Sequence, residues 1–120
     1  MRRLCWVVAT VACALVQLRP APSFAADAKE LQAKGVEYLR SAQAEDGSFS
    51  AEAGPGVTAI AAAGLLASGV DASDPVVAKA LAYLEKFIHE DGGVYPDGSA
   101  HKNYETCVAI MAFHAANKGG

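Results

Sequence analysis

A sixteen-residue segment occurs twice in this chain, with the second copy 45 residues after the first. The first copy covers residues 34–49 and the second covers residues 79–94. The two copies share six identical residues, which are Lys34, Tyr38, Leu39, Glu45, Asp46 and Gly47 in the first and Lys79, Tyr83, Leu84, Glu90, Asp91 and Gly92 in the second. Self-similarity at a fixed period is typical of repeat proteins, in which one unit cannot bury its apolar face alone. The chain is therefore expected to fold as two similar units packed on each other.

The N-terminus has the three parts of a secretory signal peptide. The basic start Met1-Arg2-Arg3 precedes an apolar run from Leu4 to Leu18, and small residues around Ala25 offer a cleavage site. We therefore expect residues 1–25 to be a signal peptide and residues 26–120 to form the mature domain, located outside the cell or in the periplasm.

Two other interpretations of the N-terminus are disfavoured. The apolar run is shorter than a membrane span usually requires, which argues against an uncleaved anchor. A lipid anchor at Cys13 would need a large aliphatic residue three positions earlier, where Thr10 stands. Cleavage and export remain the expectation.

The expected mature domain is acidic, with seven basic and thirteen acidic residues. This balance disfavours binding to nucleic acid and strong binding to an anionic membrane surface by charge. Cys107 is the only cysteine in residues 26–120, so no disulfide bond within the domain is expected. Stability must come from an apolar core, which is modest in a domain of this size.

The first half of the domain predicts an amphipathic helix followed by a wholly apolar one. Asp27 and Glu30 have the spacing of a capping box, and the helical periodicity then continues to about Gln43. Residues 57–67 contain one polar side chain, that of Thr58, which is typical of a buried helix. A Glu-Asp-Gly turn and a Gly-Pro-Gly breaker predict a loop between the two helices.

The second half has the same order of elements. Ser73 or Asp74 is expected to cap the third helix, with Pro75 at its first position. Residues 90–102 predict a loop, and residues 103–116 predict a second apolar helix. The apolar stripe expected on the third helix consists of Val76, Val77, Ala80, Leu81, Leu84, Phe87 and Ile88.

The two halves together predict an all-α fold made of two helix hairpins, residues 28–69 and 74–117. Thr58 and Thr106 stand near the starts of the apolar helices with an offset of 48 residues. The three extra residues fall in the second loop, where insertions cost little. We expect the apolar helices to form an inner layer and the amphipathic helices an outer layer.

Residues 34–49 resemble the QW motif of squalene-hopene and oxidosqualene cyclases, which recurs in the prenyltransferase and squalene oxidase repeat. The second copy resembles the motif less, because Ile88 replaces its glutamine and Val94 its aromatic residue. Gly92–Pro96 and Asn103–Thr106 also look like parts of these repeats. The resemblance implies an α/α toroid of helix pairs, of which this chain would hold two and so form an incomplete toroid. The matching positions are Lys34, Gly35, Tyr38, Leu39, Gln43, Gly47 and, in place of tryptophan, Phe49, with Tyr104 and Thr106 in the second unit.

The motif predicts structural roles for its side chains. Gln43 is expected at a helix end, where its amide can satisfy backbone groups of neighbouring helices. The ring of Phe49 should pack over that amide, while Tyr38 and Leu39 should fill the space between the helix layers.

The two Asp-Gly pairs predict tight turns. Asp46 and Asp91 are expected to act through turn chemistry rather than catalysis. Gly47 and Gly92, which follow them, are expected to need a positive φ.

The resemblance implies a terpene cyclase or a prenyltransferase, but the catalytic motifs of a cyclase are missing. Terpene cyclases of this family protonate their substrate with an Asp-x-Asp-Asp cluster, and residues 71–74 have a different spacing and are expected to cap a helix. Tyr95, Tyr104 and Phe113 are the nearest aromatic side chains that could stabilise a carbocation. Packing in the core is the expected role of all three.

A zinc site of the prenyltransferase kind is only approximated. Such a site takes an aspartate, a cysteine two residues later and a distant histidine, whereas this chain has Glu105 and Cys107 with His101 and His114 nearby. Thiolate and imidazole suit zinc. Cys107, however, lies in an apolar helix, where a buried and inert thiol is expected. No metal or other cofactor is expected, and no catalytic residue is assigned.

The expected function is that of a secreted segment of a terpene cyclase-like or prenyltransferase-like repeat protein, inactive by itself. The alternative is a non-catalytic secreted module that binds a lipid or a protein. A carbohydrate-active α/α barrel ranks lowest, because no facing pair of carboxylates is evident, and a complement-type thioester motif is absent. The expected partners are an apolar or isoprenoid ligand, or the remaining repeats of a longer chain. His89 and Lys102 are expected to be solvated.

Export provides the first test. Because the N-terminus carries a basic start, an apolar run and a small-residue cleavage site, N-terminal sequencing of the exported protein should begin near Ala26. Recovery of a chain that still begins at Met1 from the soluble cytoplasm would contradict the signal peptide.

Overall fold

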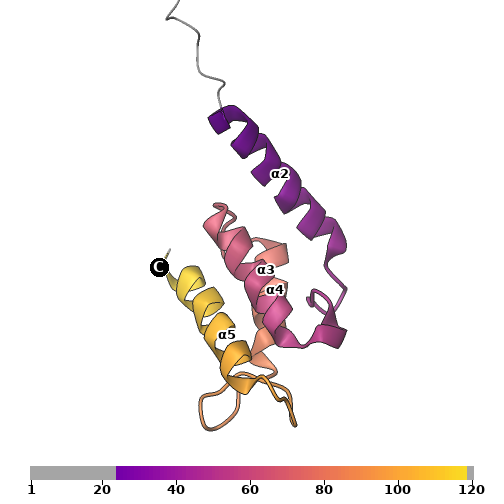
Figure 1. Ribbon diagram of the computed structural model, residues 1–120, viewed down its shortest axis with the longest axis vertical. Coiled ribbons are helices and arrows are strands. Elements are labelled where there is room, and N and C mark those ends of the chain that lie inside the picture. Colours follow the sequence, from indigo (N-terminus) through magenta and orange to yellow (C-terminus); the bar gives the residue numbers. More distant parts are fainter. Residues whose placement is uncertain (1–23, 119–120) are drawn as a thin grey trace, which may run out of the picture. The chain divides into compact units, whose positions relative to one another are not determined.

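The computed structural model describes residues 24–118, in which the regular elements are all helical (Figure 1). The expected all-α class is confirmed for this part of the chain, where the one β pairing is an isolated bridge between Ile88 and Val94. The helices are α2 (Phe24–Ala42), a 3-10 helix η1 (Ala51–Ala53), α3 (Pro55–Ala67), α4 (Pro75–Glu85) and α5 (Lys102–Asn117).

The chain divides into two compact units between Leu31 and Gln32. Of the first unit the structure describes residues 24–31, which form the beginning of α2. The contacts described below lie within the second unit. The predicted signal peptide lies outside the described residues, except for its last two positions. None of the helices in residues 24–118 has the length and apolar character that crossing a bilayer requires.

Helix α2 begins earlier than predicted. It starts at Phe24, so Asp27 lies inside its first turn and is not the cap of a capping box. The sequence signal was ambiguous because an acidic side chain is favourable both at a cap and in the first turn, where the helix dipole is positive. The predicted end is confirmed within one residue, since α2 ends at Ala42.

Helix α3 begins two residues earlier than predicted and ends as predicted. Pro55, predicted to lie in the preceding loop, is in the first turn, because proline is favourable at the first helical position. Gly69, with a φ of 85°, follows the last turn. The amide of Val70 donates to the Leu65 carbonyl at 3.1 Å, and the amide of Gly69 donates to the Leu66 carbonyl at 3.0 Å. These two bonds form a Schellman motif, which satisfies carbonyls that the helix leaves unpaired.

Helix α4 begins at the predicted cap. Asp74 is the N-cap residue, and its Oδ1 accepts a hydrogen bond of 3.1 Å from the Val76 amide, with Pro75 at the first helical position. The apolar stripe is buried along the helix, but the prediction fails at its far end. Ile88 lies beyond the end of α4 and is exposed.

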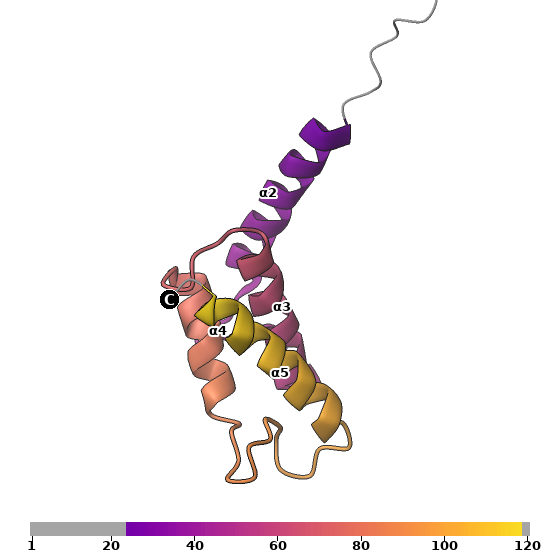
Figure 2. The same ribbon diagram turned by 90° about the vertical axis from the view of Figure 1, so that its left-hand side faces the viewer.

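Helix α3 lies side by side with α5 and also packs against α4 (Figures 1 and 2). The two apolar helices are therefore neighbours, as expected. The prediction that α3 is buried on all sides is wrong, because Val57 and Ile60 are exposed. The core consists of Phe49, Ala59, Ala62, Leu65, Val76, Val77, Ala80, Tyr83, Leu84, Val94, Ala109 and Ala112.

Both turn glycines adopt the predicted positive φ, which is 92° at Gly47 and 83° at Gly92. Their surroundings differ. A Cβ atom added at Gly47 would collide with the backbone carbonyl oxygen of Lys79 in α4, whereas nothing lies within 4 Å of a Cβ at Gly92. The turn at Asp46-Gly47, the first turn, thus packs closely against α4, whereas the turn at Asp91-Gly92, the second turn, has no such neighbour among the described residues.

The two glycines give a matched pair of substitutions. Gly92→Ala should lower the free energy of unfolding by about 1 kcal/mol, because alanine strains the positive φ. Gly47→Ala should cost about 1–3 kcal/mol more, because α4 must also move away from the new methyl group. Urea unfolding in dilute solution measures both, and equal losses would contradict the close packing at Gly47.

Candidate functional site

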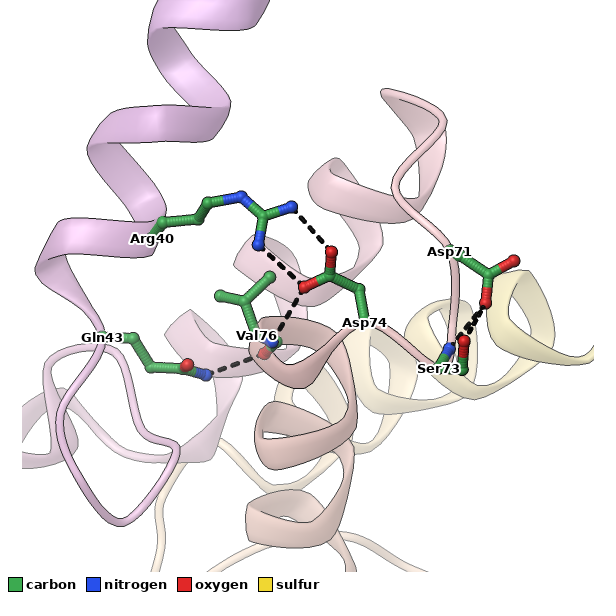
Figure 3. A network of polar contacts seen from close by, with 6 residues as sticks. All are labelled: Arg40, Gln43, Asp71, Ser73, Asp74 and Val76. Carbon is green, nitrogen blue, oxygen red and sulfur yellow. Dashed lines mark hydrogen bonds and ion pairs between the residues drawn. The ribbon is translucent and has the colours of Figure 1, made fainter.

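The side chain of Gln43 joins the end of α2 to the start of α4 (Figure 3). Its Nε2 donates to the carbonyl of Gly47 at 3.1 Å and to the carbonyl of Val76 at 2.8 Å. The bond to a neighbouring helix agrees with the role expected for this residue. The acceptor is in the first turn of α4, so it is not an unpaired carbonyl at a helix end. A carbonyl oxygen has two lone pairs and can accept this second bond.

Arg40 makes a second connection beside it. Its Nη1 and Nη2 donate to Oδ1 and Oδ2 of Asp74, both at 2.8 Å, while the same carboxylate caps α4 (Figure 3). The hydrogen bond from Arg40 lowers the pKa of Asp74. Bidentate pairs of this kind fix geometry as well as charge. No sequence pattern indicated this pair, because its two members are 34 residues apart.

Asp71 shapes the turn that leads into this cap. Its Oδ1 accepts bonds from the amide and the hydroxyl of Ser73 at 2.8 and 2.6 Å (Figure 3). The hydroxyl bond lowers the pKa of Asp71. The Asp-Ala-Ser-Asp segment therefore builds a helix start, as the sequence predicted.

The two Asp-Gly turns make the same side-chain bonds to the backbone. Oδ1 of Asp46 accepts from the amide of Ser48 at 3.0 Å, and Oδ1 of Asp91 accepts from the amide of Gly93 at 2.9 Å. The serine hydroxyl lowers the pKa of Asp46. Turn chemistry thus accounts for both aspartates, as predicted.

The two turns are also tied to the apolar helices in the same way. The Phe49 amide donates to Oγ1 of Thr58 at 2.9 Å, and the Val94 amide donates to Oγ1 of Thr106 at 3.0 Å. Within the turns, the backbone bond from Ala44 to Ser48 and the bond from His89 to Gly93 also match. The sequence identified the two threonines as equivalent but did not indicate the bonds that they make.

Helices α2 and α4 differ in how their Tyr-Leu pairs are covered. Tyr83 is 7% exposed and Leu84 is fully buried, whereas Tyr38 is 70% exposed and Leu39 is half-buried. The prediction that Tyr38 fills a space between layers is wrong. Burial raises the pKa of Tyr83, and the nearby charge of Asp46 raises it further. The first turn therefore covers Tyr83, and no described residue plays that role for Tyr38.

Four other motif positions occupy different environments. Lys34 and Gly35 lie on the exposed surface of α2, Thr106 is half-buried, and Tyr104 is exposed. The exposure of Tyr104 contradicts its expected place in the core. Its ring instead lies beside the backbone at Gly56, where an added Cβ would be 2.9 Å from Cε1 of Tyr104.

A polar cluster surrounds Tyr95 in the loop before α5. The imidazole of His89 stacks on the Tyr95 ring with centroids 4.1 Å apart, and Nζ of Lys102 lies 4.6 Å from the ring centroid. The Tyr95 hydroxyl donates to Oδ2 of Asp91 at 2.7 Å. The prediction that His89 is solvated is wrong, since the residue is half-buried and its Nε2 is 2.8 Å from the Tyr95 carbonyl oxygen.

This cluster borders a pocket of about 430 Å³ that also reaches Thr106 and Cys107. The hydrogen bond between the side chains of Tyr95 and Asp91 raises the pKa of the tyrosine and lowers that of the aspartate. Tyr95 is thus held protonated and Asp91 ionised, which gives neither an activated nucleophile nor a strong base near neutral pH. The arrangement fixes the loop.

The residues that approximate a zinc site do not assemble into one. Glu105 is buried, and its Oε2 accepts from the Ser99 hydroxyl at 2.6 Å. Cys107 is exposed, which contradicts the expected buried thiol, and His101 and His114 are exposed as well. In the part of the chain that the structure describes, no three His, Cys, Asp or Glu side chains are grouped so that they could hold a metal ion.

An apolar groove of about 320 Å³ lies between α3 and α5. Val108 and Met111 of α5 form one wall, and Met111 is 62% exposed. The other wall, on α3, consists of Ile60, Ala63, Gly64 and Ala67.

The chain was compared with models of protein families, with curated proteins and with solved structures, and none of them matches.

Gln43 and Gln32 provide a test of the junction between the end of α2 and the start of α4. Both side-chain amides donate to a backbone carbonyl. The bond of Gln43 is partly buried and joins two helices, whereas Gln32 donates to the Ser68 carbonyl in an exposed setting. Gln43→Leu should lower the free energy of unfolding by about 1–2 kcal/mol, and Gln32→Leu by less than about 0.5 kcal/mol. Chemical unfolding measures the difference, and equal effects would show that Gln43 does not hold the junction.

Proposed function

We propose that this chain is a secreted module of two helix-hairpin repeats, of the α/α toroid type found in terpene cyclases and protein prenyltransferases. The matched bonds of Thr58 and Thr106 to the turns before them carry this proposal. The same bond at the same place in both halves is what an internal repeat produces. The resemblance of residues 34–49 to the QW motif supports the specific repeat type.

The module is proposed to bind an apolar ligand of the isoprenoid class. The groove between α3 and α5 has aliphatic side chains or glycine at every lining position, and its volume of about 320 Å³ lies at the lower end of the range for ligand sites. Covering Ile60 and Met111 with an apolar chain would remove exposed hydrophobic surface from water, which is favourable.

The module is proposed to bind without catalysis. The groove contains no titratable side chain that could protonate an olefin, and the nearest polar cluster, around Tyr95, holds its tyrosine protonated and its aspartate ionised. Incubation of the chain with squalene, or with a prenyl diphosphate and an acceptor, should therefore give bound substrate and no product.

A second candidate is a module that binds a protein. It is favoured by the exposure of Tyr38 and Ile110, which lie away from the groove on α2 and α5. Their counterparts in the other half of the chain, Tyr83 and Ala62, are buried.

Displacement of an apolar fluorescent dye by squalene or farnesol tests ligand binding. Ile60→Asp and Met111→Asp should each weaken binding at least about tenfold, because a charge must then be buried against the ligand. Ala78→Asp places the same charge on the exposed surface of α4 and should leave the affinity unchanged. If the two groove variants bind as well as the unaltered chain, the groove is not the site.

A further inference from the structure

The structure contains one seam between its two halves, formed by α2, the first turn and α3 on one side and by α4 and α5 on the other. Three observations define it. Gln43 bonds to the Val76 carbonyl, Arg40 pairs with Asp74, and Gly47 lies against the backbone of Lys79. The inner part of the seam is the packing of α3 on α5, which is the most extensive in the described residues.

The residues that occupy the equivalent positions on α5 and in the second turn are uncovered. Ala62 is fully buried in α3, while Ile110, 48 positions later, is 58% exposed. Ala59 is likewise fully buried, while its counterpart Cys107 is exposed. Gly92 is open where Gly47 is covered. The second half thus has an uncovered face formed by α5 and the second turn. The corresponding face of the first half is buried against α4 and α5.

The complementary face is uncovered on the first half. An apolar groove of about 370 Å³ lies between α2 and α3, where Gly35, Tyr38 and Gly64 line it. Their counterparts in the second half are Ala80, Tyr83 and Ala112, all of which belong to the core. The groove is therefore the position that a preceding turn and inner helix would fill.

One polar contact of the seam has an apolar counterpart on the free face. Ile88 stands in the place of Gln43, so the amide bond of the seam would be replaced by apolar contact.

From these correspondences we propose that a second copy of this chain binds head to tail. The turn at residues 88–94 and the exposed flank of α5 in one copy pack into the groove between α2 and α3 of the next, in the register of the internal seam. This inference rests on the repeat proposed above. The contact is heterologous, because each copy uses two different faces, so association continues into a closed ring or an open filament.

Two variants with one blocked face each test the proposal. Tyr38→Glu should block the groove and leave the α5 flank intact, while Ile110→Glu should block the flank and leave the groove intact. Both side chains are exposed, so both variants should keep their helicity and melting behaviour, which circular dichroism checks. The full chain is used throughout, and residues 1–23 are the same in every variant.

Sedimentation velocity then gives distinct outcomes. The unaltered chain should form assemblies larger than two copies that grow with concentration. Each variant alone should be monomeric, and an equal mixture should give a species of two chains, since one intact contact remains between them. A monomeric unaltered chain, variants that assemble as it does, or a mixture that stays monomeric would each overturn the proposal.

Loss of ligand binding and loss of assembly are separable results, because neither Tyr38 nor Ile110 lines the groove between α3 and α5.

Discussion

The structure depends on the close approach of the first Asp-Gly turn to helix α4. Gly47 lies so near the carbonyl of Lys79 that no other side chain fits without moving the helix. Its positive φ is the second reason for glycine at this position. Gln43 and Arg40 flank the contact and bond to the first turn of α4 and to its cap. One turn thereby sets where helix α4 begins.

The same turn occurs a second time, but there no described residue lies within 4 Å of a Cβ added at Gly92. Asp91 and the Thr106 hydroxyl hold the second turn through the bonds that Asp46 and Thr58 make in the first. Gly92 nevertheless faces open space. A turn that keeps its internal bonds and lacks its neighbour marks a face suited to another helix. This contrast between one covered turn and one open turn underlies both the proposed repeat and the proposed head-to-tail contact.

The elements that could be predicted from the sequence are those whose signals are local. Gly69 and the Asp74-Pro75 pair determine helix ends through their own backbone preferences, and the structure places the end of α3 and the start of α4 there. The positive φ of Gly47 follows in the same way from its place in a turn. Local chemistry is sufficient for such features.

The predictions that failed concern which distant parts of the chain pack against a given side chain. Tyr38 and Tyr83 have the same local sequence pattern, but only Tyr83 has a turn packed over it. Cys107 was expected to be buried because its helix is apolar, and it is exposed because its face of α5 has no neighbour among the described residues. The pair of Arg40 and Asp74 could not be found, since two charges 34 residues apart leave no pattern in a single sequence.

We propose that the two turns are equivalent and differ in what covers them. Amide hydrogen exchange at residues 44–49 and 89–94, followed as a function of protein concentration, measures this difference. We expect slow exchange in the first turn at every concentration. In the second turn we expect faster exchange in the dilute protein, slowing towards the rate of the first turn as the concentration rises. Equal rates in both turns at all concentrations, or a rate in the second turn that never changes, would contradict the proposal.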